Sequence, residues 1–264
     1  MSHLTVDISR KRHYFIPGQE KPVFLPSVTT IIGAMSDKSG LDVWRKKVGE
    51  EKADQITKFS ANRGTMMHTH IENYLSHDSE DKKVRLLESL KKTHEDGTAA
   101  GYSKEEMAVG RKLFYNFYLN NTFDRIKRVV LQEAMLWSLN GGGYAGRTDN
   151  IYEDHSGLHV VSDFKTSRKP KKEEWIDGYK MQASAYFVAY WELYQVRPDR
   201  CEIWISNEED SLPQIFTISR TEVKSWYSSF LDMVRDYHSQ YGGEIQEYIE
   251  KISKDGFTEQ QSIS

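Results

Sequence analysis

The spacing of apolar residues predicts a mainly helical first half of the chain. Short strands are expected within an extended N-terminal segment of 26 residues, at 13–16 and 23–26. Ser27 precedes an apolar run and is typical of a residue that caps the start of a helix. Apolar residues then recur at helical intervals, which predicts helices over 41–76, 80–93 and 103–120. Gly64 is expected to divide the first of these helices in two, and 95–101 is expected to be a loop.

The sequence pattern of the second half of the chain is typical of a β-sheet. Runs of β-branched and aromatic residues separated by turn residues predict strands over 128–137, 144–152, 158–164, 201–206 and 214–218. The run 158–164 is apolar enough to lie at the centre of a sheet. Helical spacing returns over 171–195 and 220–251. This order predicts an α/β fold, in which a central sheet is flanked by helices and carries an added N-terminal helical region.

Three segments are expected along the chain. Residues 1–125 form the mainly helical region packed on the core, 126–252 form the core, and 253–264 form a flexible polar tail. A length of 264 residues suits one large domain or a core with a helical elaboration. A charged fraction of 28% is ordinary for a soluble protein. Because the net charge is only −3, any contact with nucleic acid must come from local basic patches.

Cysteine usage and hydropathy exclude several classes of protein. The chain has one cysteine, Cys201, which excludes an internal disulfide, a cysteine-based zinc site and a four-cysteine iron–sulfur cluster. No apolar run approaches the roughly 20 residues of a membrane-spanning helix, so no membrane partner is expected. The N-terminus lacks the apolar stretch of a signal peptide and the Arg-rich helix of a transit peptide. We therefore expect a cytoplasmic protein, or one in the host cytoplasm if it is viral.

Two aspartates and a lysine on predicted strands are the strongest candidates for chemistry. Asp163 and Lys165 alternate along one strand and therefore share a face, and Asp149 lies on the preceding strand across a hairpin. Two adjacent carboxylates repel unless a cation lies between them, and oxygen ligands suit Mg²⁺ or Mn²⁺. Lys165 would add a positive donor near a phosphate. The alternative interpretation is a solvated strand face, since an Asp-x-Lys triplet is common.

Two further residues could join these acids. His68 lies on a predicted helix, and imidazole is a good ligand for a transition-type divalent ion. Glu133 lies in mid-strand among apolar neighbours, where a buried acid needs a metal or a lysine as its partner. An outward-facing position on an edge strand is the alternative for Glu133. Tyr179, Gln182 and Tyr186 fall on one stripe of the helix that follows, and the glutamine is not easily explained as core.

In order and spacing, four short motifs resemble the RecB-like branch of the PD-(D/E)xK nuclease superfamily. They are Gly64-x-x-x-His68, Gly146-x-x-Asp149, Asp163-x-Lys165 and Tyr179-x-x-Gln182. The N-terminal Pro26-Ser-Val-Thr-Thr-Ile-Ile, followed by Trp44, looks most like the mitochondrial genome maintenance exonucleases and their bacteriophage relatives. The resemblance covers roughly residues 26–220. It implies a restriction-endonuclease-like core with a central mixed sheet.

The resemblance also implies a role for each matching residue. His68, Asp149, Asp163 and the backbone carbonyl of Phe164 would bind Mg²⁺ or Mn²⁺, and Lys165 would be the catalytic lysine. Gln182 would orient Lys165 or contact DNA, Tyr186 would support that helix, and Glu133 matches a strand acid of some members. Relatives with an iron–sulfur cluster carry four cysteines, so no cluster is expected here. The expected activity is metal-dependent exonucleolytic cleavage of DNA in replication, recombination or repair.

The loop after the second aspartate is the expected contact with the substrate. Its candidates for binding phosphates and bases, together with the two tyrosines of the helix, are Thr166, Ser167, Arg168, Lys169, Tyr179 and Tyr186. A solvated loop is the alternative. The partner would be DNA with a free end, single-stranded or duplex, and both directions of digestion fit the residues equally well. Two other functions stay open: a structure-specific endonuclease on the same fold, and a non-catalytic DNA-binding accessory protein of recombination.

Overall fold

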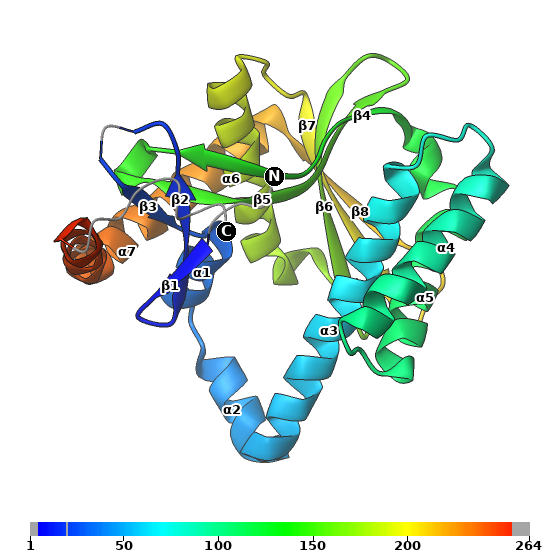
Figure 1. The fold of residues 1–264 in the computed structure, drawn as a ribbon, viewed down its shortest axis with the longest axis horizontal. Coiled ribbons are helices and arrows are strands. Elements are labelled where there is room, and N and C mark those ends of the chain that lie inside the picture. Colours follow the sequence, from blue (N-terminus) through cyan, green and yellow to red (C-terminus); the bar gives the residue numbers. More distant parts are fainter. Residues whose placement is uncertain (1–4, 20, 255–264) are drawn as a thin grey trace.

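A five-stranded mixed sheet forms the centre of the molecule (Figure 1). The computed structural model describes residues 5–19 and 21–254. In chain order and in space, the strands are β4 (Ile126–Ser138), β5 (Tyr144–Asp154), β6 (His159–Ser167), β7 (Arg200–Asn207) and β8 (Gln214–Ser219). β6 and β7 run parallel, and the other neighbouring pairs are antiparallel. The sheet confirms the predicted α/β fold, and β6 is its middle strand, as the sequence predicts.

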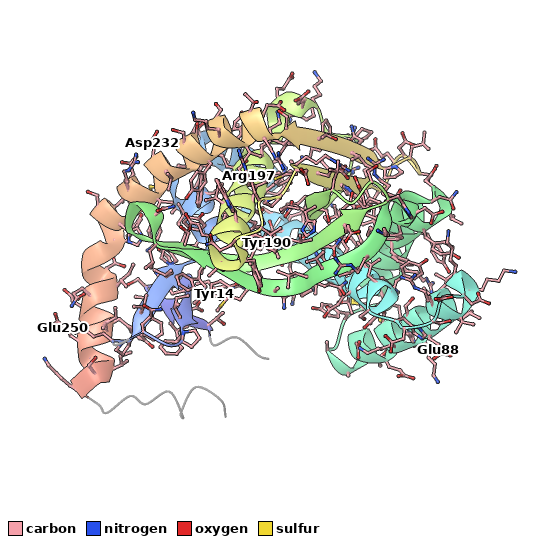
Figure 2. All side chains as sticks on the ribbon, turned by 90° about the horizontal axis from the view of Figure 1, so that it is seen from above. Tyr14, Glu88, Tyr190, Arg197, Asp232 and Glu250 are labelled. Atoms are coloured by element: carbon pink, nitrogen blue, oxygen red, sulfur yellow. The ribbon has the colours of Figure 1, made fainter. Side chains whose placement is uncertain are left out.

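Helices cover both faces of this sheet. α6 (Asp177–Tyr194) and α7 (Arg220–Lys254) pack on one face, whereas α3 (Glu50–Leu75) and α5 (Lys104–Leu119) pack on the other. Strand alternation divides the core accordingly, because Ile151 belongs to the first cluster and its neighbour Tyr152 to the second. α4 (Lys82–Ala99) packs outside α3. Figure 2 shows α7, marked by Asp232, and α4, marked by Glu88, on opposite sides of the strands.

A small N-terminal sheet packs beside the main one. Its antiparallel strands are β1 (Thr5–Ile8), β2 (Lys11–Ile16) and β3 (Val23–Pro26). Ser27 caps α1 (Val28–Met35) as predicted, because its Oγ accepts a hydrogen bond from the backbone N–H of Thr30 at 2.9 Å. α2 (Ser39–Val48) then leads to α3. Residues 1–4 and 20 of the predicted extended segment lie outside the described residues, as does the predicted tail beyond Lys254.

The predicted break at Gly64 is wrong, because α3 is continuous through this residue. The chain bends at Gly49 instead, between α2 and α3, where φ is 90°. Gly64 lies where α3 meets the end of β6: a Cβ at this position would be 3.4 Å from Oγ1 of Thr166. That distance is ordinary van der Waals contact, so Gly64 lies at the contact of helix and strand but does not end the helix.

The predicted loop at 95–101 is also wrong over most of its length, since α4 continues to Ala99. Gly97 packs against α3, and a Cβ there would lie 2.8 Å from Cε of Met66. Gly110 of α5 approaches the same methionine, with a Cβ position 2.4 Å from its Cβ. Three helices can therefore meet around Met66 only because two of them carry glycine at the contact.

The helix predicted over 171–195 begins later than expected, at Asp177. The backbone of Lys171 is held outside it by the Gln214 side chain, which accepts from its N–H at 2.7 Å and donates to its carbonyl at 2.9 Å. Three short 3₁₀ turns complete the fold: η1 (Thr122–Arg125), η2 (Asn140–Gly142) and η3 (Glu173–Trp175). Among the described residues, no helix combines the length and the apolar character needed to cross a membrane.

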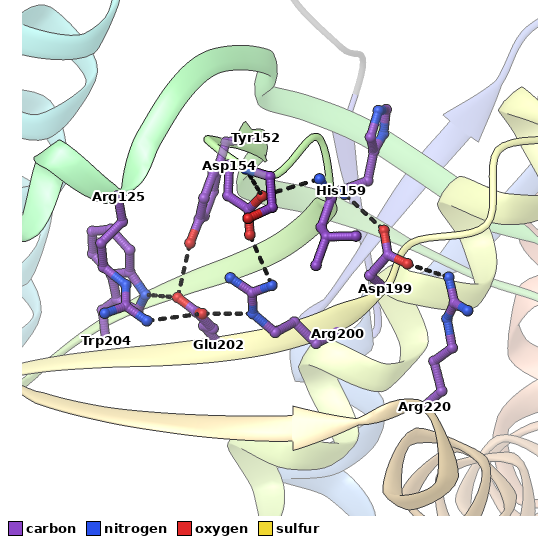
Figure 3. Close-up of polar contacts among 11 residues, drawn as sticks. Arg125, Tyr152, Asp154, His159, Asp199, Arg200, Glu202, Trp204 and Arg220 are labelled. Atoms are coloured by element: carbon purple, nitrogen blue, oxygen red, sulfur yellow. Dashed lines mark hydrogen bonds and ion pairs between the residues drawn. The ribbon is translucent and has the colours of Figure 1, made fainter.

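A buried acid of β7, Glu202, bonds to side chains of β5, β7 and η1 (Figure 3). The carboxylate of Glu202 accepts from the Tyr152 hydroxyl at 2.9 Å, from the Trp204 indole at 2.9 Å, and from Arg200 at 2.8 Å. Arg125 of η1 adds an ion pair at 3.3 Å. Burial opposes the charge on Glu202, but these donors outweigh it and lower the pKa of the carboxyl. The network leaves Glu202 fully satisfied, which indicates a structural role.

Candidate active site

A polar cavity of about 940 Å³ lies where α3 crosses the middle of β4 and β5 and the C-terminal end of β6. The N-terminal sheet and the start of α1 form its other wall. Eight of the residues predicted from the sequence line it: His68, Glu133, Asp149, Phe164, Lys165, Thr166, Gln182 and Tyr186. The fold therefore brings residues from α3, three strands and α6 to one place.

His68 meets two carboxylates at the centre of this cavity. Its Nδ1 lies 3.6 Å from Oδ1 of Asp149 and 4.0 Å from Oε1 of Glu133. One ligand atom from each of the three side chains lies within 4.8 Å of the others. Burial lowers the pKa of His68, although Asp149 opposes this shift, so the imidazole is neutral and able to bind a metal at neutral pH.

Asp149 lies where the pairing of β5 with β6 ends, and its side chain bonds across to β6. The pairing of β5 with β6 extends only as far as Asn150 and Ser162, and beyond them the strands no longer form a ladder. Oδ2 of Asp149 accepts the backbone N–H of Phe164 at 2.7 Å, so the side chain replaces a ladder hydrogen bond. This bond fixes one carboxylate oxygen and leaves the other directed at His68.

Asp163 and Lys165 lie on the same face of β6 and form an ion pair. Only 1% of the Asp163 side chain is exposed, and burial raises the pKa of this carboxyl even though Lys165 opposes the shift. Burial also disfavours the charge on Lys165, but Asp163 and Asp149 outweigh it and raise the pKa of the amine. The ammonium lies 5.2 Å from the centre of the Tyr179 ring. Lys165 is thus a desolvated cation beside the two aspartates.

Glu133 enters the site from a strained backbone. Its φ is 47°, a left-handed conformation that is rare for a non-glycine residue and costs about 1–3 kcal/mol. Burial, and then the charge of Asp149, raise the pKa of its carboxyl to about 8. Arg147 counters this shift with Nε at 2.7 Å from Oε2. Glu133 does lie on an edge strand, but its side chain faces the cavity.

Gln182 and Tyr186 form the floor of the site on α6. Both are buried, and Gln182 hydrogen-bonds the Tyr186 hydroxyl. A Cβ at Gly146 would lie 2.6 Å from this hydroxyl oxygen, so only glycine lets the tyrosine lie against β5. The glycine of the Gly146-x-x-Asp149 motif therefore makes room for α6, three residues before the acid.

The loop residues predicted to contact DNA divide into two groups. Thr166 lines the cavity, whereas Ser167 is buried and its hydroxyl donates to the carbonyl of Lys169 at 2.6 Å. Nζ of Lys169 lies 3.7 Å from Glu209, and Arg168 is exposed. These basic residues and Tyr179 lie outside the cavity lining, so the fold places them at its margin or beyond.

Two arginines of the cavity lining were not predicted from the sequence. Arg147 lies two residues before Asp149, and strand alternation could have indicated that both face the same side. Arg12 comes from β2, and no signal in the sequence connects this strand with β6. Both contribute positive charge opposite α3.

The residues of the site fit a hard divalent cation. Two carboxyl groups and a neutral imidazole converge. A cation between Glu133 and Asp149 would relieve the repulsion that helps to raise the pKa of Glu133. Asp163 lies outside this group and pairs with Lys165. The geometry thus brings Glu133 together with His68 and Asp149, two of the ligands that the resemblance implies.

Comparison with known proteins identifies the family. No curated protein matches the sequence. A solved structure titled "Crystal structure of SSO0001" is similar over 68% of this chain and 86% of that chain, with 17% identity and a TM-score of 0.31. A family model matches residues 40–259, which include every motif residue from Gly64 to Gln182. Members of this family are nucleases that use divalent metal ions, typically Mg²⁺ or Mn²⁺. The chain therefore belongs to the PD-(D/E)XK nuclease superfamily.

Proposed function

We propose that this nuclease is a metal-dependent exonuclease that removes nucleotides from DNA ends. The observation that carries the proposal is the convergence of His68, from a helix distant in sequence, with Glu133 and Asp149. Asp163 and Lys165 lie beside them on β6. The motif resemblance to the RecB-like branch, and to the mitochondrial genome maintenance exonucleases, supports the same function in DNA replication, recombination or repair.

Each side chain has a distinct task in this proposal. His68, Glu133 and Asp149 would hold Mg²⁺ or Mn²⁺. The family resemblance adds Asp163 and the Phe164 carbonyl, both on β6, as further ligands. When bound, the ion would polarise the phosphodiester and lower the pKa of the attacking water. Lys165 donates to a non-bridging phosphate oxygen and stabilises the charge that develops there. Tyr186 and Gln182 support this strand end from beneath.

The walls of the cavity favour a substrate with a free end. Arg12 and Ser27 line one side, whereas His68 and Thr65 of α3 line the other. α2 joins these two walls, so the chain passes from α1 around to α3 (Figure 1). The end of a DNA strand can enter such a site between the two walls. A continuous duplex has no end to insert and would have to approach from the open side of the cavity. This arrangement supports exonucleolytic over endonucleolytic cleavage.

Exonuclease and endonuclease activity can be distinguished with one DNA sequence, prepared as a linear molecule and as a covalently closed circle. In Mg²⁺, the protein should release nucleotides progressively from a linear, end-labelled DNA and leave the covalently closed circle intact. Single-stranded and duplex forms of each substrate, labelled at either end, would give the strand preference and the direction. Cleavage of the closed circle at a rate comparable with the linear form would contradict the proposal and favour an endonuclease.

A further inference from the structure

Two basic side chains neutralise the acids of the site, and they differ in exposure. Lys165 pairs with Asp163, and 18% of its side chain is exposed. Arg147 pairs with Glu133, and 58% of its side chain is exposed. Arg147 lies on β5, two residues from Asp149, and lines the cavity. The exposed guanidinium of Arg147 can therefore turn away from Glu133 without disturbing the core. The less exposed side chain of Lys165 cannot turn away from Asp163 in the same way.

We propose that Arg147 pairs with the Glu133 carboxylate until a metal ion binds there, and that the guanidinium of Arg147 then binds a phosphate of the DNA. This inference rests on the proposed function and adds a positioning residue to it. Arg147 holds Oε2 of Glu133, whereas Oε1 faces His68. An ion bound on the same carboxylate would repel the guanidinium beside it, so binding of the ion releases the arginine. Guanidinium has planar, paired donors that match phosphate geometry, which an arginine in a nuclease cavity can use directly.

The exchange couples the two ligands of the site. When Arg147 binds DNA, Glu133 becomes available to the ion. When the ion binds Glu133, Arg147 becomes available to DNA. Each ligand therefore raises the affinity for the other, and the coupling is reciprocal by thermodynamic linkage. Glu133 is suited to this exchange because its carboxylate lies between the group of His68 and Asp149 on one side and Arg147 on the other.

The Arg147→Gln variant separates the two effects, since they have opposite signs. Calorimetric titration with Mg²⁺ in the absence of DNA should show about three- to tenfold tighter binding than in the wild type, because the competing cation is gone. Anisotropy titration of a labelled oligonucleotide in Ca²⁺ should show about tenfold weaker binding. The dependence of log Kd on log salt concentration should lose about one unit of slope. The difference in DNA affinity between Ca²⁺ and EDTA should also shrink.

Arg12→Gln is the matched control. Arg12 also lines the cavity, but it lies on β2, and the arginine that pairs with Glu133 is Arg147. Its loss should leave Mg²⁺ affinity unchanged. Unchanged or weaker Mg²⁺ binding by Arg147→Gln would overturn the competition, and unchanged DNA affinity would overturn the phosphate contact. If the wild-type protein binds neither Mg²⁺ nor DNA, the proposed function itself fails, together with this inference.

Discussion

Replacement of Lys165 by methionine is expected to slow DNA cleavage by about 10²- to 10⁴-fold. The amine lies beside Asp163 and Asp149, in a buried position where a positive donor acts on a phosphate with little screening by water. Methionine keeps the length and packing of the side chain but removes the charge. Rates are measured on end-labelled linear DNA at saturating Mg²⁺, so that the loss reports on the chemical step.

Stability must be followed in the same variant. Without Lys165, Asp163 is a buried carboxylate that has lost its ion-pair partner, and this destabilises the protein in the absence of metal. Thermal unfolding in Mg²⁺ shows whether the variant is folded under assay conditions. Lys104→Met, on the exposed start of α5, is the control and should keep full activity. Turnover by Lys165→Met within about threefold of the wild-type rate would exclude Lys165 from catalysis.

Glycine in place of Glu133 is expected to change metal affinity and stability in opposite directions. Loss of the carboxylate should weaken Mg²⁺ binding by at least about 100-fold, since even residues that only orient metal ligands contribute 10- to 100-fold. The same change removes the φ strain of about 1–3 kcal/mol and a buried acid beside Asp149. The greater entropy of glycine in the unfolded chain offsets about 0.5–1 kcal/mol. A net gain of about 1–2 kcal/mol in the free energy of unfolding is therefore expected without metal.

Glu133→Gln distinguishes the charge from the strain. Glutamine keeps the left-handed backbone but cannot form the carboxylate that would bind the ion, so it should lose metal affinity like glycine but gain less stability. Urea unfolding in EDTA measures the stabilities, and calorimetry measures Mg²⁺ affinity. Equal stability of the glycine variant and the wild type would show that the backbone of Glu133 stores no strain. Wild-type metal affinity in both variants would exclude Glu133 from the ligand set.

The strands, and the central place of one of them, could be predicted because their pattern is local. Runs of β-branched and aromatic residues predicted β5 and β6, and the apolar run of β6 predicted its central position, which the structure confirms. The helices were harder to bound because their glycines reflect tertiary contacts. Gly97 and Gly110 pack against Met66 at distances that leave no room for a Cβ. A rule that treats glycine as a helix breaker cannot anticipate these close approaches.

The candidate site could be predicted only as a set of residues and not as an arrangement. Strand alternation places Asp163 with Lys165, but the contact of His68 with Glu133 depends on how α3 crosses the sheet. Arg147 was missed because its importance follows from its ion pair with Glu133. The left-handed φ of Glu133 has no signature in the sequence, because neither glycine nor a turn residue marks it.

In the proposed function, His68 and the strand acids bind one divalent ion together. Electron spin-echo envelope modulation of the Mn²⁺-loaded protein tests this binding, since a directly bound imidazole gives a ¹⁴N modulation. We expect this modulation in the wild type and its disappearance in His68→Gln, with Mn²⁺ affinity reduced in Asp149→Asn. Mn²⁺ bound with no nitrogen signal, or with a signal that persists in His68→Gln, would show that His68 does not bind the ion.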